Sequence, residues 1–178
     1  TSYYRPDWGF CVTDAQYQLL ANCTEPLTVV IETELKPGSI SYGEYLLPGN
    51  SKKEILISCY ICHPSMANDN LSGVLLTAFL ARYLSKRKKR QWSYRIIFVP
   101  ETIGAIAYCA RNETAMNAID FGLVVTTVGG PGKLGYKQSY NSMHPINAII
   151  ESILTRKEKD FITYPFDING SDERQYSS

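Results

Sequence analysis

The chain has 178 residues, of which 44% are hydrophobic and 20% are charged, and its formal net charge is +1. This composition is that of an ordinary globular domain, and the near-neutral charge excludes a general attraction to nucleic acid or to a membrane surface. The apolar runs are too short to span a membrane and no signal peptide precedes them, so the sequence predicts a soluble protein.

The first 53 residues predict an N-terminal appendage that consists of one helix and one β-hairpin. Thr13 is followed three residues later by Gln16, a capping-box pattern that predicts a short helix in "TDAQYQLLANC". The stretches "LTVVIETEL" and "SISYGEYLL" are separated by a Pro-Gly turn and followed by a Pro-Gly-Asn turn. Residues 27 to 50 are therefore expected to form an antiparallel hairpin.

Residues 54 to 178 predict a separate α/β domain. The apolar runs "EILISCYI", "YRIIFVP", "FGLVVTTV" and "FITYPF" read as strands, and "LSGVLLTAFLARYLSKRKKR" and "PINAIIESILTRKEK" read as helices between them. This alternation favours a mostly parallel sheet with helices on both faces. The chain starts without a methionine and stops in the polar stretch "GSDERQYSS", so we expect a piece of a longer protein, truncated at the C-terminus of this domain.

The only basic block, Lys86 to Arg90, follows the first of these helices. Cations are favoured at a helix C-terminus, so we interpret the block as a solvated helix end. A nucleic-acid binder would need aromatic residues between the charges, and none is present.

Five cysteines, an odd number without a compact framework, favour reduced thiols and a cytoplasmic protein. Cys59 and Cys62 form a CxxC motif, but no second pair follows at zinc-ribbon spacing. Positions three apart on a strand face opposite ways, so we interpret both residues as core thiols.

Three residues with useful chemistry follow predicted strands. His63 lies just beyond "EILISCYI", Asp69 lies in the loop that leads to the next helix, and Glu101 directly follows "YRIIFVP". The carboxyl ends of parallel strands share one edge of a sheet, so we expect these side chains to cluster there. Imidazole and carboxylate groups bind zinc, and a further carboxylate can act as a general base.

Each residue also has a simpler interpretation. A single histidine in a loop is often only hydrogen-bonded. Asp69 can serve as an N-cap or a turn residue at the helix start, where Asn70 or Ser72 would serve equally well. Glu101 can be a solvated carboxylate at the end of a strand.

The motifs that surround these residues resemble a known family. "ANDNLSGVLLTAFLARYL", "IIFVPETIGAIAY" and "NGSDERQY" are similar, in order and spacing, to motifs of the zinc-dependent aminopeptidases that include bacterial leucyl aminopeptidase and glutamate carboxypeptidase. The similarity covers about residues 54 to 178. "CHPSMANDNLSG" with "GSDERQY" looks like a bacterial aminopeptidase-like branch that is sometimes encoded beside surface-polysaccharide genes.

The resemblance implies that His63 and Asp69 are metal ligands and that Glu101 is the general base. Two carboxylate ligands of the family fall on Thr102 and Thr126, which favours one zinc ion rather than two. The family's last ligand, a histidine beyond the "SDExxY" loop, would lie after the end of this chain. His144 comes too early in the sequence to replace it.

We therefore expect a zinc-dependent, aminopeptidase-like hydrolase that acts on a small peptide or amide and binds neither nucleic acid nor membrane. In this mechanism Glu101 activates a metal-bound water. Asp172 and Arg174 are candidates for orienting the substrate terminus, although both also suit an ordinary polar loop. The alternative is a binding or scaffold module that kept the fold and lost catalysis, with a link to surface-polysaccharide biosynthesis.

Overall fold

The computed structural model describes residues 9–64, 66–167 and 171–177. The chain divides into two compact units, Thr1–Gly38 and Ser39–Ser178. No helix in the described part is long and apolar enough to cross a membrane.

The first unit contains helix α1 (Asp14–Ala21), which confirms the predicted helix. The capping box is complete, because the Gln16 N–H donates to Thr13 Oγ1 at 3.3 Å and the Thr13 N–H donates to Gln16 Oε1 at 2.9 Å. No residue of α1 is buried.

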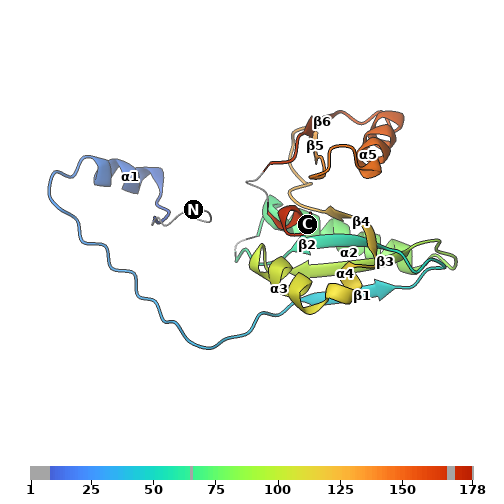
Figure 1. Ribbon diagram of the computed structural model, residues 1–178. Coiled ribbons are helices and arrows are strands. Elements are labelled where there is room, and N and C mark those ends of the chain that lie inside the picture. The colour runs from blue at the N-terminus through green and yellow to red at the C-terminus, as the bar shows by residue number, and fades with distance from the viewer. Residues whose placement is uncertain (1–8, 65, 168–170, 178) are drawn as a thin grey trace. The chain divides into compact units, whose positions relative to one another are not determined.

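The second unit contains a four-stranded mixed sheet. Its strands are β1 (Gly43–Leu47), β2 (Glu54–Tyr60), β3 (Ser93–Val99) and β4 (Ile119–Val124), in the order β1-β3-β2-β4 (Figure 1). β2 pairs in parallel with β3 and β4, whereas β1 runs antiparallel to β3. Neighbouring parallel strands bring the loops after β2 and β3 to the same edge.

The hairpin predicted over residues 27 to 50 is not formed. Its second half contains β1, but β1 pairs with β3, and its first half forms no strand in the described structure. Pairing with β3 buries Leu47, which is 5% exposed, and brings Glu44 to Arg95. A two-stranded hairpin alone would bury little apolar surface, so the sheet is the better partner.

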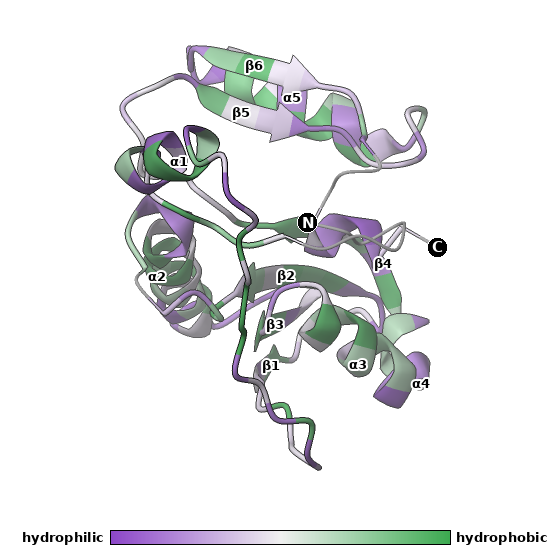
Figure 2. Cartoon of the chain, turned by 90° about the vertical axis from the view of Figure 1, so that its left-hand side faces the viewer, coloured by the Kyte–Doolittle hydropathy of each residue, from purple (hydrophilic) through white to green (hydrophobic). Residues whose placement is uncertain are grey.

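Two separate apolar clusters join helices to the four-stranded sheet. Figure 2 shows the helices that flank the sheet. Alternate residues of a strand face opposite sides of a sheet, which separates Leu56 from Ile57 and Ile96 from Ile97. The first cluster joins Leu56, Ile97 and Val99 to Ala105 and Tyr108 of α3 (Ile103–Arg111), and the second joins Leu47, Ile57 and Ile96 to Leu80, Ala81 and Leu84 of α2 (Gly73–Ser85). The short helix α4 (Glu113–Met116) adds Met116 to the first cluster.

A buried ionic cluster also lies in this sheet. The guanidinium of Arg95, 8% exposed, donates from Nε and Nη2 to the carboxylate of Glu54 at 2.6 and 3.0 Å. It also contacts Glu44 and the hydroxyl of Tyr108. These contacts link β1, β2, β3 and α3.

A smaller part of the second unit consists of β5 (Leu134–Lys137), α5 (Pro145–Arg156) and β6 (Phe161–Tyr164). β6 covers the first four residues of the predicted strand "FITYPF", and it pairs in parallel with β5 in a two-stranded sheet of its own rather than with the other predicted strands. The helix expected after Pro145 is confirmed as α5, and His144 caps it by accepting the Ile146 N–H at Nδ1, 3.2 Å away.

Candidate metal centre

The structure brings together the three residues that sequence analysis selected. His63 lies after β2, Asp69 lies in the turn η1 (Asn68–Ser72) before α2, and Glu101 lies after β3. His63 Nε2 is 3.6 Å from Asp69 Oδ2 and 3.7 Å from Glu101 Oε2. The side chains are 34%, 50% and 28% exposed, respectively, so solvent can reach all three.

Tyr60, the last residue of β2, orients two members of this group. Its hydroxyl donates to Asp69 Oδ1 at 2.6 Å and lies 2.6 Å from Thr126 Oγ1, which must then donate to it. Its ring lies against that of His63, with the centroids 5.3 Å apart. Burial, followed by the hydrogen bond to Asp69, raises the pKa of Tyr60, which keeps the hydroxyl protonated as a donor.

Asn70 fixes the turn that carries Asp69. Its buried side-chain amide donates to the carbonyls of Tyr60 and Val125 at 3.3 and 3.2 Å, and its oxygen accepts the Thr127 N–H at 3.0 Å. A Cβ on Gly73 would lie 2.4 Å from both Asn70 Oδ1 and Val125 O, so this close approach requires glycine. No side chain caps α2, so the N-cap interpretation of Asp69 does not describe this structure.

Glu101 begins a tight turn. The Ile103 N–H donates to Glu101 O at 2.7 Å, and Thr102 between them has φ 61° and ψ −69°. This conformation is strained for a residue other than glycine, and such strain is often found at functional sites.

Two residues of the "SDER" loop hold this turn in place. Asp172 Oδ1 accepts the Thr102 N–H at 2.7 Å, and Ser171 Oγ donates to Glu101 Oε1 at 2.5 Å. Asp172 is fully buried, and this burial raises its pKa to about 6 despite the Thr102 N–H, which lowers it. The carboxylate expected to contact a substrate therefore holds the backbone beside Glu101.

Arg174, the other residue expected to contact a substrate, ends the short 3₁₀ turn η2 (Asp172–Arg174) and is partly exposed. The structure thus brings His63, Asp69 and Glu101 into one group, with Asp172 directly behind it.

Sequence analysis missed Cys62. Cys59 is buried, as expected of a core thiol, but Cys62 is exposed and lies beyond the end of β2. Potential ligand atoms of Cys62, His63 and Glu101 all lie within 4.8 Å of one another. The sequence contains one signal for this role, which is that Cys62 directly precedes His63. It lies beyond the end of the strand, where the alternation of buried and exposed residues no longer applies.

The donor set suits a divalent metal ion. A tetrahedral zinc ion with ordinary bond lengths would hold a nitrogen and an oxygen ligand about 3.4 Å apart. The separation between His63 Nε2 and Asp69 Oδ2 is 3.6 Å, so these atoms need only small movements to share an ion. The structure therefore contains a possible metal site at His63.

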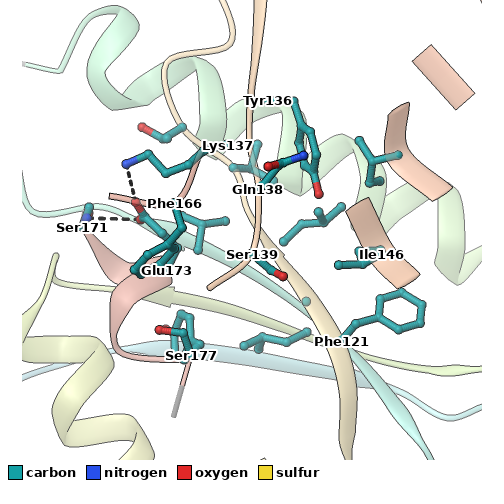
Figure 3. Close-up of a pocket in the computed structure, with 18 of the residues that line it drawn as sticks. Phe121, Tyr136, Lys137, Gln138, Ser139, Ile146, Phe166, Ser171, Glu173 and Ser177 are labelled. Atoms are coloured by element: carbon teal, nitrogen blue, oxygen red, sulfur yellow. Dashed lines mark hydrogen bonds and ion pairs between the residues drawn. The ribbon is translucent and has the colours of Figure 1, made fainter. Parts of the chain in front are cut away.

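A cavity of about 1330 Å³ is lined by neighbours of the three candidate residues rather than by those residues themselves. Tyr60, which contacts His63 and Asp69, and Ser171, which contacts Glu101, are part of its lining. Figure 3 shows its lining, which includes apolar and aromatic side chains such as Phe121, Tyr136, Ile146 and Phe166. An ion pair joins Lys137 Nζ to Glu173 Oε1 at 2.9 Å in the same cavity (Figure 3). The cavity provides space for a ligand beside the candidate metal centre.

Comparison with solved structures defines the class of fold. The chain aligns over 99% of its length with 41% of the chain in "Crystal structure of putative peptidase from CLOSTRIDIUM ACETOBUTYLICUM at 2.37 A resolution", at a TM-score of 0.80 and 44% identity. Porphyromonas gingivalis glutaminyl cyclase aligns over 77% of this chain and 59% of its own, at a TM-score of 0.62 and 17% identity, and so shows the fold alone. The protein has an aminopeptidase-like α/β fold.

The chain belongs to the family described as "Domain of unknown function (DUF4910)", which matches residues 6–178. It is 45% identical over all 178 residues to the Clostridium acetobutylicum protein named "Putative polysaccharide biosynthesis protein with aminopeptidase-like domain". The chain covers 40% of that relative's length.

Proposed function

We propose that the protein is a metal-dependent hydrolase of peptide or amide bonds and that it uses one zinc ion. The observation that carries this proposal is the arrangement around His63 Nε2, which lies 3.6 Å from Asp69 Oδ2 and 3.7 Å from Glu101 Oε2. Two loops supply these groups, because the connection from β2 to α2 carries both His63 and Asp69 and the turn after β3 carries Glu101. The aminopeptidase-like name of the Clostridium relative agrees with this class of reaction.

His63 and Asp69 would hold the ion, with Asp69 oriented by the Tyr60 hydroxyl. The bound ion would supply a Lewis acid that polarises the scissile carbonyl and activates the attacking water. Glu101 is the general base. Ser171 engages Glu101 Oε1, which leaves Oε2, on the His63 side, to accept a proton from the water and later deliver it to the leaving amine.

One zinc ion is favoured over two because the expected carboxylates are replaced. The hydroxyl of Thr126 donates a hydrogen bond to the Tyr60 hydroxyl. Thr102 lies in the strained turn, and its backbone N–H donates to Asp172 Oδ1. Neither residue offers the negative charge that a second zinc ion would need.

The cavity beside the centre suits a small peptide or amide substrate. Its lining combines apolar and aromatic side chains such as Phe121 and Phe166 with polar ones such as Gln138, and in such cavities the apolar surface buries the body of a ligand while the polar groups orient it. We propose that Arg174, which lies on η2 between the lining residues Glu173 and Gln175, contacts the substrate terminus at the edge of the cavity, whereas Asp172 acts indirectly by holding Thr102.

The test is Glu101→Gln in the full-length protein, with a set of peptides and acylated amines as substrates. Glutamine retains the size of glutamate and can still accept the Ser171 hydrogen bond, but it cannot act as the base. Turnover should fall by about two to four orders of magnitude while zinc binding survives. Glu158→Gln, at an exposed position after α5, is the matched control and should leave both properties unchanged.

Two results would contradict this mechanism. Unchanged turnover in Glu101→Gln would remove Glu101 as the base, and loss of zinc would make Glu101 a ligand instead. His63→Ala should lose both zinc and activity, whereas His144→Asn, which can keep the cap of α5, should bind zinc as the unaltered protein does.

A scaffold module without catalysis is the second candidate, because Thr102 and Thr126 stand where the family resemblance places carboxylates. The name of the Clostridium relative would then point to a role in polysaccharide biosynthesis. Elemental analysis separates the candidates, since a scaffold of this kind would carry no stoichiometric zinc.

A further inference from the structure

The two ring nitrogens of His63 face different partners. Nε2 faces the carboxylates of Asp69 and Glu101, at 3.6 and 3.7 Å, whereas Nδ1 lies 3.5 Å from the sulfur of Cys62. A neutral imidazole carries one proton, so Nε2 is available to a metal ion only when the proton is on Nδ1. In that tautomer the Nδ1–H points to a sulfur that can accept it.

The same sulfur contacts Glu101. The backbone N–H of Glu101 donates to Cys62 Sγ at 3.2 Å. The preceding residue, Ile61, donates its N–H to Val99 O at 3.0 Å, which extends the pairing of β2 and β3 up to Cys62. Cys62 is therefore held opposite the start of the turn that carries Glu101.

We infer that Cys62 is a positioning residue of the candidate metal centre. Its sulfur accepts one hydrogen bond from His63 Nδ1–H and one from the Glu101 N–H, and so fixes the tautomer of the ligand and the backbone of the base together. This inference rests on the proposed function, because it gives Cys62 a role only where His63 Nε2 binds a metal ion.

The chemistry of sulfur suits this role. Histidine ligands of metals commonly donate their second N–H to a carboxylate, a carbonyl or water, which sets the ring orientation. A carboxylate at position 62 would add a third negative group next to Asp69 and Glu101. A cysteine sulfur has a larger radius than oxygen and is a weak hydrogen-bond acceptor. It can therefore accept from two N–H groups, at 3.2 and 3.5 Å, without adding a negative charge to the site.

Zinc affinity of the full-length protein gives the first readout. Cys62→Ala removes both acceptor contacts and should weaken zinc binding by about 10–100-fold, the usual effect of losing a group that orients a ligand. Cys62→Ser restores an acceptor at the same position and should bind zinc more tightly than Cys62→Ala. Cys11→Ala, which removes another exposed thiol, is the control and should bind as the unaltered protein does.

The tautomer of His63 gives a second readout that a purely structural role would not change. In nitrogen NMR spectra of the zinc-free protein, with the His63 signals assigned by their loss in His63→Ala, a measurable fraction of the neutral ring should carry its proton on Nδ1, although the carboxylates of Asp69 and Glu101 favour a proton on Nε2. In Cys62→Ala the proton should shift toward Nε2. Cobalt substitution should give no sulfur-to-metal charge-transfer absorption, because the sulfur does not ligate the ion.

The outcomes separate this inference from the proposed function. Zinc binding with equal affinity in Cys62→Ala, or an unchanged tautomer, would overturn the role of Cys62 and leave the hydrolase proposal standing. A charge-transfer band that disappears in Cys62→Ser would make Cys62 a ligand and also overturn the inference. Absence of zinc from the unaltered protein would overturn the proposed function itself.

Discussion

Two clusters of ionisable residues, one within the four-stranded sheet and one in the loops at its edge, differ in how closely their members approach. Around Arg95, nitrogen and oxygen atoms meet at 2.6 and 3.0 Å, and the guanidinium is almost fully buried. Around His63, the corresponding distances are 3.6 and 3.7 Å, and the side chains are between 28% and 50% exposed. The members of the first cluster are joined by direct hydrogen bonds, whereas the ionisable groups of the second lie too far apart for direct hydrogen bonds between them.

This difference separates a structural cluster from a candidate functional one. A buried guanidinium needs close hydrogen-bonding partners, because an unpaired buried charge is costly. The partners of Arg95 come from β1, β2 and α3, so they stabilise the sheet. In the group around His63, one carboxylate oxygen of Asp69 and one of Glu101 instead face His63 Nε2 at 3.6 and 3.7 Å. Tyr60, Asn70 and Asp172 hold the surrounding backbone and side chains in place.

The largest expected effect on stability is therefore at Arg95. Arg95→Ala leaves the buried carboxylate of Glu54 without its partner and should lower the free energy of unfolding by about 3–5 kcal/mol, measured by urea denaturation. The exposed pair of Lys53 and Asp120 is the matched control, and Lys53→Ala should cost less than about 1 kcal/mol.

His63→Ala should also cost little stability, because its neighbours remain solvated. The contrast between the two clusters would be lost if His63→Ala destabilised the protein as much as Arg95→Ala does.

Asp172 sharpens the contrast, because it is a fully buried carboxylate behind the solvent-accessible centre. Its pKa in the folded chain is about 6 because of burial, above the ordinary value of 3.8. The folded state therefore binds this proton more tightly than the unfolded state does. The stabilising contribution is complete below about pH 4 and is lost as the pH rises through about 6.

Asp172→Asn should remove this dependence. Between about pH 4 and pH 6, the unaltered protein should lose on the order of 1–2 kcal/mol more unfolding free energy than the variant does. Denaturation series at several pH values would measure the difference. Parallel pH profiles in the two proteins would show that Asp172 does not titrate in this range.

The main site could be predicted from sequence because its geometry follows from topology. His63 and Glu101 directly follow two strands that pair in parallel, so both loops reach one edge. Asp69 lies close behind in the loop to α2. The interpretation of Cys62 as a core thiol is wrong, because β2 ends at Tyr60 and strand alternation does not extend to residue 62. The sequence does not predict the burial of Asp172, because "SDER" has the composition of a solvated loop.

The errors in the predicted strand pairing also arise because a local pattern does not show which distant residues a segment contacts. The Pro-Gly patterns near residues 37 and 49 are local signals, but the structure forms no turn at residue 37, and the choice of β3 as the partner of β1 depends on distant residues such as Arg95. Likewise, "FITYPF" was recognised as a strand, whereas its partner β5 has only four residues and gives a weak pattern. Strand identity is largely local, but pairing depends on the whole fold.

The most direct test of the account is anomalous diffraction at the zinc edge from crystals of the full-length protein grown with zinc. The account predicts one peak at this centre, about 2.0–2.2 Å from both His63 Nε2 and an oxygen of Asp69, with Cys62 Sγ beyond bonding distance. No peak there, or a peak bonded to Cys62 Sγ instead of Asp69, would contradict the metal centre proposed for this protein.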